Sequence, residues 1–212
     1  MAEISKSNLD NQTAAFSSES TMSQLEVEYL KSRISKSQRF LEFGAGFSTK
    51  LALQNEKIQI ISVETSSDYI NNLKREITDS GKDLSKIEFI HTDIGPTGDW
   101  GRPIDESQID KWPVYTELAW NRIREIHFKP DLILIDGRFR VASLIQAWRF
   151  APGCTVLFDD YKNRTHYHKV EELIKPAKLV GRIATFEIPR FFRGKGQKNA
   201  LRLLPIYRYE SE

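Results

Sequence analysis

Residues 39–53, RFLEFGAGFSTKLAL, determine the fold of this chain. The apolar run at residues 40–43 predicts a buried strand. The glycine turn at residues 44–46 ends that strand, and Ser48 or Thr49 can then cap a helix that carries the following leucines. A strand, a glycine turn and a helix in this order let a ligand approach the backbone without meeting a Cβ atom. The free N–H groups at the helix start would face that ligand.

A carboxylate follows this turn at an informative distance. The next apolar run, residues 58–63, predicts a second strand that leads into Glu64. An acidic residue at the end of the second strand, about 20 residues after a glycine turn, is where α/β proteins hold the ribose hydroxyls of a nucleoside. The alternative is a glycine loop in an ordinary α/β sheet, with Glu64 as a solvated strand end.

The third position of the glycine motif separates two classes of nucleotide-binding protein. The dinucleotide pattern is G-x-G-x-x-G, whereas this chain has Thr49 at the third position, which disfavours a pyrophosphate ligand. The pattern E-x-G-x-G-x-S-T, followed by an acidic end to the second strand, resembles the class I S-adenosylmethionine-dependent methyltransferases over residues 40–158. The resemblance implies S-adenosylmethionine as the cofactor and does not identify the substrate.

The resemblance also implies a set of cofactor contacts. Glu42 and the two glycines of the turn would line the methionyl end, and Glu64 would bind the ribose hydroxyls. Asp93 would meet the adenine amino group while Ile94 packs on the ring, unless Asp93 is an ordinary turn aspartate. The predicted cofactor-binding residues are Glu42, Gly44, Ala45, Gly46, Ser48, Glu64, Thr65, Asp93, Ile94 and Asp136.

Length, charge and cysteine content limit the class of protein. The 212 residues suit one α/β domain, and a net charge of +2 neither requires nor excludes nucleic acid. The single cysteine, Cys154, cannot form an internal disulfide, which fits a reducing cytoplasm. No apolar run is long enough for a membrane span and no signal peptide is evident, so we expect a cytoplasmic protein.

Alternating strands and helices predict an α/β fold. The polar residues 1–20 predict a mobile arm, and residues 21–212 a single domain. Residues 181–188 and 201–207 are expected to form a C-terminal antiparallel hairpin. The resemblance then implies a three-layer Rossmann-like sandwich with a seven-stranded, mostly parallel sheet in the order 3-2-1-4-5-7-6. Further strands are expected at residues 87–91, 131–135 and 155–158, and helices at residues 21–34, 67–79, 115–126, 139–150 and 166–174.

Residues 95–113, GPTGDWGRPIDESQIDKWP, form an inserted loop that is too long for a simple connection between a strand and a helix. Trp100 and Trp112 in this loop are costly to expose to water, so we expect the loop to fold over a ligand. We interpret it as a lid over the substrate side of the cleft, carried by these two tryptophans. The alternatives are a packed surface loop and a subunit contact.

Three carboxylates, those of Asp136, Asp159 and Asp160, are expected to converge at the ends of the fourth and fifth strands. Oxygen ligands suit Mg²⁺ or another divalent cation. The arrangement resembles that of the cation-dependent O-methyltransferases of the catechol type, which have an asparagine at the position of Asp160. The lysine motif of those enzymes is replaced here by Gly137-Arg138-Phe139-Arg140.

The alternative is a site without metal. Asp136 would then face the substrate, while Asp159 or Asp160 would cap the next helix. Unpaired carboxylates in one cleft repel each other, so a positive group is expected nearby. Arg138 and Arg140 can supply that charge, or they can bind a carboxylate or phosphate of the substrate.

Two further groups are candidates for a role in the reaction. His166, close to His168, can act as a general base at neutral pH, although histidines at a helix start are commonly surface caps. The predicted catalytic residues are therefore Asp136, Asp159, Asp160 and His166. The basic segment of residues 190–198, RFFRGKGQK, can contact RNA or an acidic substrate, or it can form a solvated hairpin tip.

The sequence therefore predicts a methyltransferase that acts on a small molecule, at oxygen, with a divalent cation as an option. A small-molecule methyl acceptor is the expected partner; a homodimer and contact with nucleic acid stay open. The alternatives are an RNA or protein methyltransferase, a NAD(P)-dependent oxidoreductase and a non-catalytic cofactor-binding protein. An asparagine or aspartate followed by P-P-[YF] is missing after the fourth strand, which argues against methylation of base amino groups.

Overall fold

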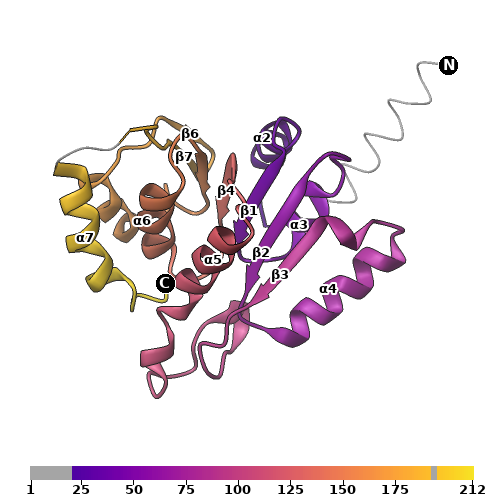
Figure 1. Cartoon of the computed structure of the whole chain (residues 1–212), viewed down its shortest axis with the longest axis horizontal. Helices are drawn as coiled ribbons and strands as arrows, with labels where there is room; N and C mark the ends of the chain where they lie inside the picture. Colours follow the sequence, from indigo (N-terminus) through magenta and orange to yellow (C-terminus); the bar gives the residue numbers. More distant parts are fainter. Residues whose placement is uncertain (1–20, 192–194) are drawn as a thin grey trace.

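The computed structural model describes residues 21–191 and 195–212, so the predicted arm at residues 1–20 lies outside the described residues. Within the described ranges, seven strands form one sheet in the order β3-β2-β1-β4-β5-β7-β6, which confirms the predicted topology (Figure 1). Strands β1 to β5 are parallel, β7 is antiparallel to β5, and β6 is antiparallel to β7. The strands are β1 (Arg39–Phe43), β2 (Gln59–Glu64), β3 (Ile87–His91), β4 (Leu132–Ile135), β5 (Thr155–Phe158), β6 (Lys178–Val180) and β7 (Ile183–Glu187).

Helices cover both faces of the sheet, because residues along each central strand point alternately to the two sides. On β1, Phe40 packs with the helices of one face, whereas Leu41 and Phe43 pack with those of the other. The first face carries α2 (Gln24–Ile34), α3 (Phe47–Ala52) and α4 (Ser67–Asp79). The second carries α5 (Val114–Glu125), α6 (Arg140–Phe150) and α7 (Lys195–Tyr207). In Figure 1, α7 lies at one end of the molecule and α4 at the other.

Short 3-10 helices complete the connections. They are η1 (Leu84–Lys86), η2 (Asp99–Gly101), η3 (Ile109–Lys111) and η4 (Thr165–Glu172). Two of them, η2 and η3, lie in the inserted loop at residues 95–113. The last of them, η4, replaces the helix predicted at residues 166–174.

The register of the parallel strands brings their carboxyl ends to one level. Phe43 at the end of β1 pairs with Val63 of β2 and with Ile135 of β4. Ile135 in turn pairs with Phe158 of β5. The residues that follow these positions therefore leave the sheet side by side, at the edge where open α/β sheets bind ligands.

The C-terminal part differs from the prediction. The antiparallel hairpin is made by β6 and β7, and residues 201–207, which we expected to be its second strand, belong to the helix α7. The buried residues of this segment, Ala200, Leu203 and Tyr207, have the spacing of a helix. Over a stretch as short as residues 201–207, a helical pattern of apolar residues is easily mistaken for the alternation of a strand. The prediction of a basic hairpin tip at residues 190–198 is also wrong: residues 192–194 lie outside the described part, and α7 begins at Lys195.

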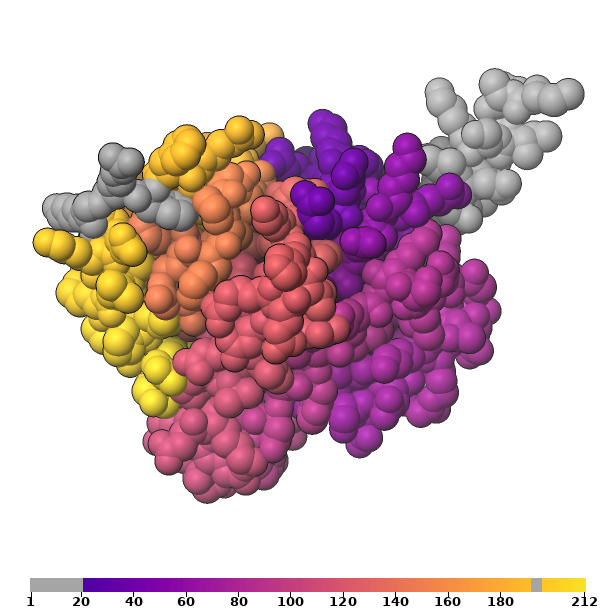
Figure 2. All heavy atoms as spheres, viewed as in Figure 1, coloured from indigo at the N-terminus to yellow at the C-terminus, as the bar shows by residue number. Residues whose placement is uncertain are grey.

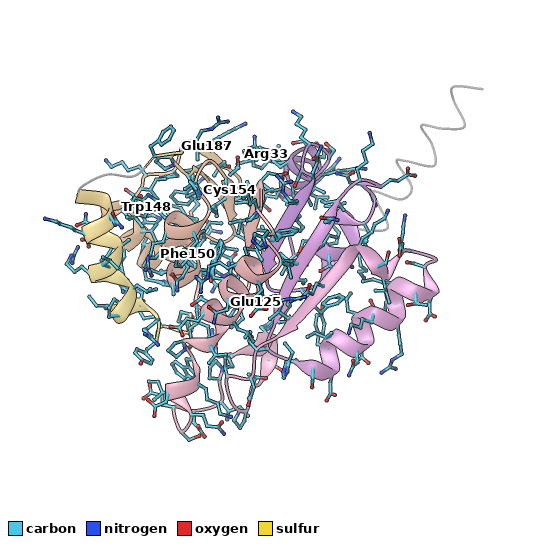
Figure 3. The ribbon with its side chains drawn as sticks, viewed as in Figure 1. Arg33, Glu125, Trp148, Phe150, Cys154 and Glu187 are labelled. Atoms are coloured by element: carbon cyan, nitrogen blue, oxygen red, sulfur yellow. The ribbon has the colours of Figure 1, made fainter. Side chains whose placement is uncertain are left out.

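Polar contacts connect α2, the first described helix, to strands β5 and β7. Arg33 of α2 donates to the Thr155 hydroxyl at 2.9 Å and forms an ion pair with Glu187 of β7 at 3.4 Å. Figure 3 shows Arg33 and Glu187 near each other at the top of the view. Cys154 is buried and free, as a lone cysteine must be. Among the described helices, none has the length and apolar character that a bilayer crossing requires.

The loops after β1 and β4 touch backbone to backbone. A Cβ atom added at Gly44, which has φ +99°, would lie 2.7 Å from the backbone nitrogen of Gly137. A Cβ atom added at Gly137 would lie 2.2 Å from the Tyr115 hydroxyl. Both distances are far below van der Waals contact, so glycine at both positions permits the close approach.

We expect Gly137→Ala to lower the free energy of unfolding by about 1–3 kcal/mol, because the new methyl group overpacks this contact. Replacing Tyr115 with phenylalanine in the same chain should recover part of that loss, since it removes the atom that the methyl group meets first. Chemical denaturation of the two single variants and the double variant measures the coupling. Gly98→Ala is the matched control, because its Cβ would meet only ordinary contacts near 3.9 Å. Equal stability of Gly137→Ala and the wild type would contradict the account of this contact.

Candidate active site

A cavity of about 940 Å³ lies at the carboxyl ends of the central strands. This volume is within the usual range for a site that binds a small molecule or cofactor. Its walls come from the glycine turn after β1, the ends of β2, β4 and β5, and the inserted loop. The lining residues include Gly44, Ala45, Gly46, Ser48, Glu64, Tyr69, Trp100, Arg102, Asp136, Arg138, Arg140, Asp159, Asp160, Arg164 and Arg182.

Glu42 is buried behind the glycine turn and does not line the cavity, contrary to the prediction. Its carboxylate accepts hydrogen bonds from the hydroxyls of Ser48, Thr49 and Ser62. Thr49 also accepts a hydrogen bond from the backbone N–H of Gly46 at 2.9 Å. The Glu42 carboxylate therefore holds the glycine turn and the start of α3 in place from behind the cavity wall. Burial raises the pKa of Glu42 to about 7, although its three hydroxyl donors oppose the rise.

Glu64 lies at the cavity wall, as predicted. Its Oε1 accepts hydrogen bonds from the backbone N–H groups of Thr65 and Ser66, at 2.6 and 3.1 Å. Its Oε2 accepts a longer hydrogen bond, of 3.3 Å, from the backbone N–H of Ala45. One carboxylate oxygen thus fixes the start of the segment before α4, while the other retains acceptor capacity for a ligand.

Besides Glu42, three further predicted cofactor residues are not among the residues that line the cavity. Asp93 is exposed, forms an ion pair with Lys111 at 2.8 Å and accepts a hydrogen bond from the backbone N–H of Gly95, which is the turn role weighed above. Ile94 is buried in the core, and Thr65 is buried with its hydroxyl directed to Glu64. The predicted adenine contacts of Asp93 and Ile94 are therefore not supported by their positions.

Tyr69 lines the cavity and was not among the predicted site residues. It lies in the first turn of α4, and its exposed fraction is 45%. A Cβ atom added at Gly46 would lie 3.0 Å from the Tyr69 hydroxyl, so the aromatic ring adjoins the glycine turn. Its place one turn into the helix that follows Glu64 was the available signal.

The two tryptophans of the inserted loop have different roles. Trp112 is buried and packs on Phe139, with ring centroids 5.7 Å apart, so the prediction that it forms part of a lid is wrong. Trp100 lines the cavity and is 82% exposed. Burial of Trp112 anchors one end of the loop to the core and leaves the segment around Trp100 at the cavity. The lid role of Trp100 stays a prediction.

The tip of the inserted loop is held against the end of β2. A Cβ atom added at Gly101 would lie 2.6 Å from the Thr65 hydroxyl and 3.7 Å from Glu64 Oε1. Thr97 and Pro103 form an isolated antiparallel bridge at the base of this tip. In Figure 2 the inserted loop forms a lobe at the lower edge of the molecule, next to the C-terminal segment. The loop is thus one wall of the site.

The three predicted acids converge, but arginines neutralise them. Arg182 donates to both carboxylate oxygens of Asp159, from Nε at 2.9 Å and from Nη2 at 3.0 Å. Arg140 forms ion pairs with Asp136 at 3.3 Å and with Asp160 at 3.2 Å. Arg164 pairs with Asp160 at 3.1 Å, and Arg182 also contacts Asp160 at 3.1 Å.

This pairing corrects the prediction of a metal site at Asp136, Asp159 and Asp160. Within residues 21–191 and 195–212, no group of three or more His, Cys, Asp or Glu side chains is arranged to hold a metal ion. Arg140 supplies the positive charge that the alternative without metal required, as the sequence allowed. Arg164 and Arg182 were not anticipated: Arg164 follows Asp160 by only four residues, whereas Arg182 lies 23 residues after Asp159.

Asp136 is the acid of this group that is most open to a ligand. A third of its side chain is exposed, compared with 16% for Asp160 and 1% for Asp159. Burial and the neighbouring charge of Asp159 raise the pKa of Asp136 above that of an ordinary aspartate, and Arg140 only partly offsets them. Such a carboxyl can accept a proton near neutral pH.

The predicted histidine base is not at the site. His166 is exposed, does not line the cavity and lies beside Tyr167, with the two rings tilted and their centroids 4.2 Å apart. His168 lies against Tyr161, and its Nε2 is 3.1 Å from the Tyr161 carbonyl oxygen. The prediction of His166 as a catalytic residue is therefore wrong, and the surface alternative holds.

Comparison with known proteins places the chain in a family. A methyltransferase-like protein from Silicibacter pomeroyi is 32% identical, aligns with 92% of this chain and 98% of its own, and superposes with a TM-score of 0.79. This chain belongs to the class I methyltransferase family. The family and the enzyme class predicted from the sequence are thereby confirmed. No protein-family model and no curated protein matches the chain.

More distant structures resemble this methyltransferase. A protein from Corynebacterium glutamicum is 13% identical over 92% of this chain and 93% of its own, with a TM-score of 0.53, which shows the common fold alone. A putative caffeoyl-CoA O-methyltransferase from Staphylococcus aureus is 12% identical over 94% of this chain and 78% of its own. Its TM-score of 0.46 is too low to bear on the substrate of this chain.

The cavity of the methyltransferase fits S-adenosylmethionine. Gly44 and Gly46 leave its backbone wall bare at the end of β1, as close approach of a ligand requires. Glu64 Oε2 can accept from ribose hydroxyls, and Tyr69 adds an aromatic surface beside it. Asp136 lines the same cavity from the end of β4. These groups would hold the cofactor across the ends of the neighbouring strands β2, β1 and β4.

We expect the raised pKa of Glu42 to make stability depend on pH. Below the ordinary glutamate value of 4.5, both the folded and the unfolded state carry the proton. As the pH rises from there to about 7, unfolding releases the proton, so the free energy of unfolding falls across this window and is level above it. Over this pH window, the free energy of unfolding of the wild type should fall by about 2–3 kcal/mol relative to that of Glu42→Gln.

Urea unfolding at pH 4.5, 6 and 8 measures this difference, with the exposed Glu56→Gln as the control of the same chemical change. A difference between the wild type and Glu42→Gln that stays constant with pH would contradict the raised pKa.

Proposed function

We propose that this chain is an S-adenosylmethionine-dependent methyltransferase that methylates a hydroxyl group of a small molecule. The observation that carries the proposal is that one cavity combines the bare glycine turn, the carboxylate of Glu64 and the open carboxyl of Asp136. The cofactor, when bound, supplies an electrophilic methyl group whose leaving group is a neutral thioether. The protein therefore has to align the acceptor and remove its proton.

Asp136 is the group that we assign to proton removal. A hydroxyl acceptor is a poor nucleophile until it loses its proton, and a positioned carboxylate contributes about 10²–10⁴-fold to such a step. An aspartate with an ordinary pKa is a weak base, so the raised pKa of Asp136 matches it better to this task. Arg140, held by the Gly137 carbonyl at 2.9 Å and the Asp159 carbonyl at 2.7 Å, keeps Asp136 in place through its ion pair.

A small acceptor is favoured by the inserted loop. Residues 98–104 line the same cavity as Asp136, and Gly101 among them lies against Thr65 at the end of β2, so the acceptor shares the cavity with this loop. Within the basic segment 190–198, which suggested RNA, the described side chains of Arg190 and Lys198 are not among the residues that line the cavity. Trp100 extends from the loop at the cavity, where closure over bound ligands would bury it.

We expect Glu64→Ala to weaken the binding of S-adenosylhomocysteine by about 1.5–3 kcal/mol, because a charge-assisted hydrogen bond to the ribose is lost. Isothermal titration calorimetry measures the affinity directly. Glu56→Ala, an exposed glutamate between α3 and β2, should bind as the wild type does. Unchanged affinity in Glu64→Ala would remove this residue from the cofactor site.

Asp136→Asn should lower kcat/KM by about 10²–10⁴-fold with any acceptor identified by release of S-adenosylhomocysteine. In the wild type, kcat/KM should rise with pH, because Asp136 becomes a base only above its raised pKa. That rise should disappear in the variant. Because arginines neutralise the three acids, EDTA should leave the wild-type rate unchanged. A wild-type rate in Asp136→Asn, or a rate that needs added Mg²⁺ after EDTA, would contradict this assignment.

A further inference from the structure

Arg138 carries a buried positive charge that lacks a carboxylate partner among the described residues. It is 7% exposed and lines the cavity, and its Nε has no hydrogen-bond partner in the described part of the chain. The other buried or half-buried arginines of the cavity wall are all engaged with acids. These are Arg140, Arg164 and Arg182, which contact Asp136, Asp159 and Asp160.

The local backbone explains why Arg138 does not share these acids. Phe139 adopts a left-handed conformation, with φ 51°, and separates Arg138 from the helix that begins at Arg140. The backbone N–H of Arg138 donates to the Tyr115 hydroxyl at 3.4 Å. Arg140 instead reaches the carbonyl oxygens of Asp136 and Asp159, at 3.0 and 2.7 Å.

An unpaired guanidinium in such a place is costly to keep. It cannot lose its proton at neutral pH, and removing it from water without an acceptor is unfavourable. Burial lowers the pKa of Arg138, and repulsion by Arg140 and by Arg102 of the inserted loop acts in the same direction. Arg140 is itself paired with Asp136 and Asp160, and Arg102 is paired with Glu212, so among the described residues the uncompensated charge on this side of the cavity is that of Arg138. An anion placed beside Arg138 would supply the acceptor that its guanidinium lacks.

We propose that Arg138 binds an anionic group, a carboxylate or a phosphate, on the methyl acceptor. The planar guanidinium matches such groups with two parallel hydrogen bonds, and its orphaned Nε–H is one of the donors. Because Arg138 is two residues from Asp136, binding of the anion would bring a hydroxyl on the same molecule to the carboxyl that accepts its proton. The acceptor class is then a small hydroxylated acid or phosphate ester. The part of this inference that concerns methylation rests on the proposed function. The binding of an anion by Arg138 does not.

The test follows the Nε–H of Arg138 by NMR in protein labelled with ¹⁵N-arginine and saturated with S-adenosylhomocysteine. Sodium phosphate and sodium benzoate are titrated separately at constant ionic strength, with neutral benzamide as the control ligand. We expect one of the two anions to shift the Arg138 signal saturably, while benzamide does not. The anion that acts identifies phosphate or carboxylate as the recognised group.

Arg138→Gln should weaken binding of that anion at least about tenfold, and Arg138→Lys should retain part of it, because the charge stays while the fork geometry is lost. Arg75→Gln, a surface arginine on α4, is the control of equal charge change and should bind as the wild type does. If Arg138→Gln fails to fold, the anion titration of the wild-type Arg138 signal and the anion affinity of Arg138→Lys still test the proposal.

The absence of a saturable shift with either anion, or equal anion binding by Arg138→Gln, would overturn the proposal. Failure of the wild type to bind S-adenosylhomocysteine would instead overturn the proposed function. In that case the anion titration of the free protein still tests Arg138 on its own.

Discussion

The close approach of the loops after β1 and β4 is the constraint on which the site depends. Gly44 and Gly137 meet with no side chain between their backbones, and a Cβ atom on either would collide with the other. Because the strands end at one level, this contact fixes the distance between the cofactor side of the cavity, at Gly44 and Glu64, and its acceptor side, at Asp136 and Arg138. Alignment of two reactants is the main task of an enzyme whose leaving group is already good.

The charges of the site are arranged around this contact. Three acids and three arginines from β4, β5, α6 and the segment before β7 neutralise one another where a metal ion was expected. Charge pairs of this kind are costly to desolvate, but removing one member would cost more, so the group is rigid once formed. Two groups of the cavity wall are open to a ligand: the partly exposed carboxyl of Asp136, which belongs to this cluster, and the guanidinium of Arg138, which has no carboxylate partner among the described residues. The carboxyl of Asp136 suits the acceptance of a proton, and the guanidinium of Arg138 suits the binding of an anion.

The sequence predicted most of the fold, and it predicted the glycine turn and Glu64, which line the cavity, while the cofactor contacts themselves stay a prediction. The glycine turn, the acidic end of β2 and the strand positions are local patterns, and parallel strands bring their ends together by necessity. Predictions failed where the hydrogen-bond or packing partners of a side chain determine its position. Glu42 is withdrawn from the ligand by three hydroxyls, and Trp112 is buried against Phe139. Arg182, which neutralises Asp159, is 23 residues away from it in the chain.

The most direct test of the central claim is a crystal structure of the protein with bound S-adenosylhomocysteine. The account predicts the ribose hydroxyls at Glu64, the amino-acid portion along the glycine turn, and the sulfur facing the side of the cavity that Asp136 and Arg138 line. A ligand bound in another part of the molecule, or one that leaves Glu64 and Gly44 without contact, would contradict it.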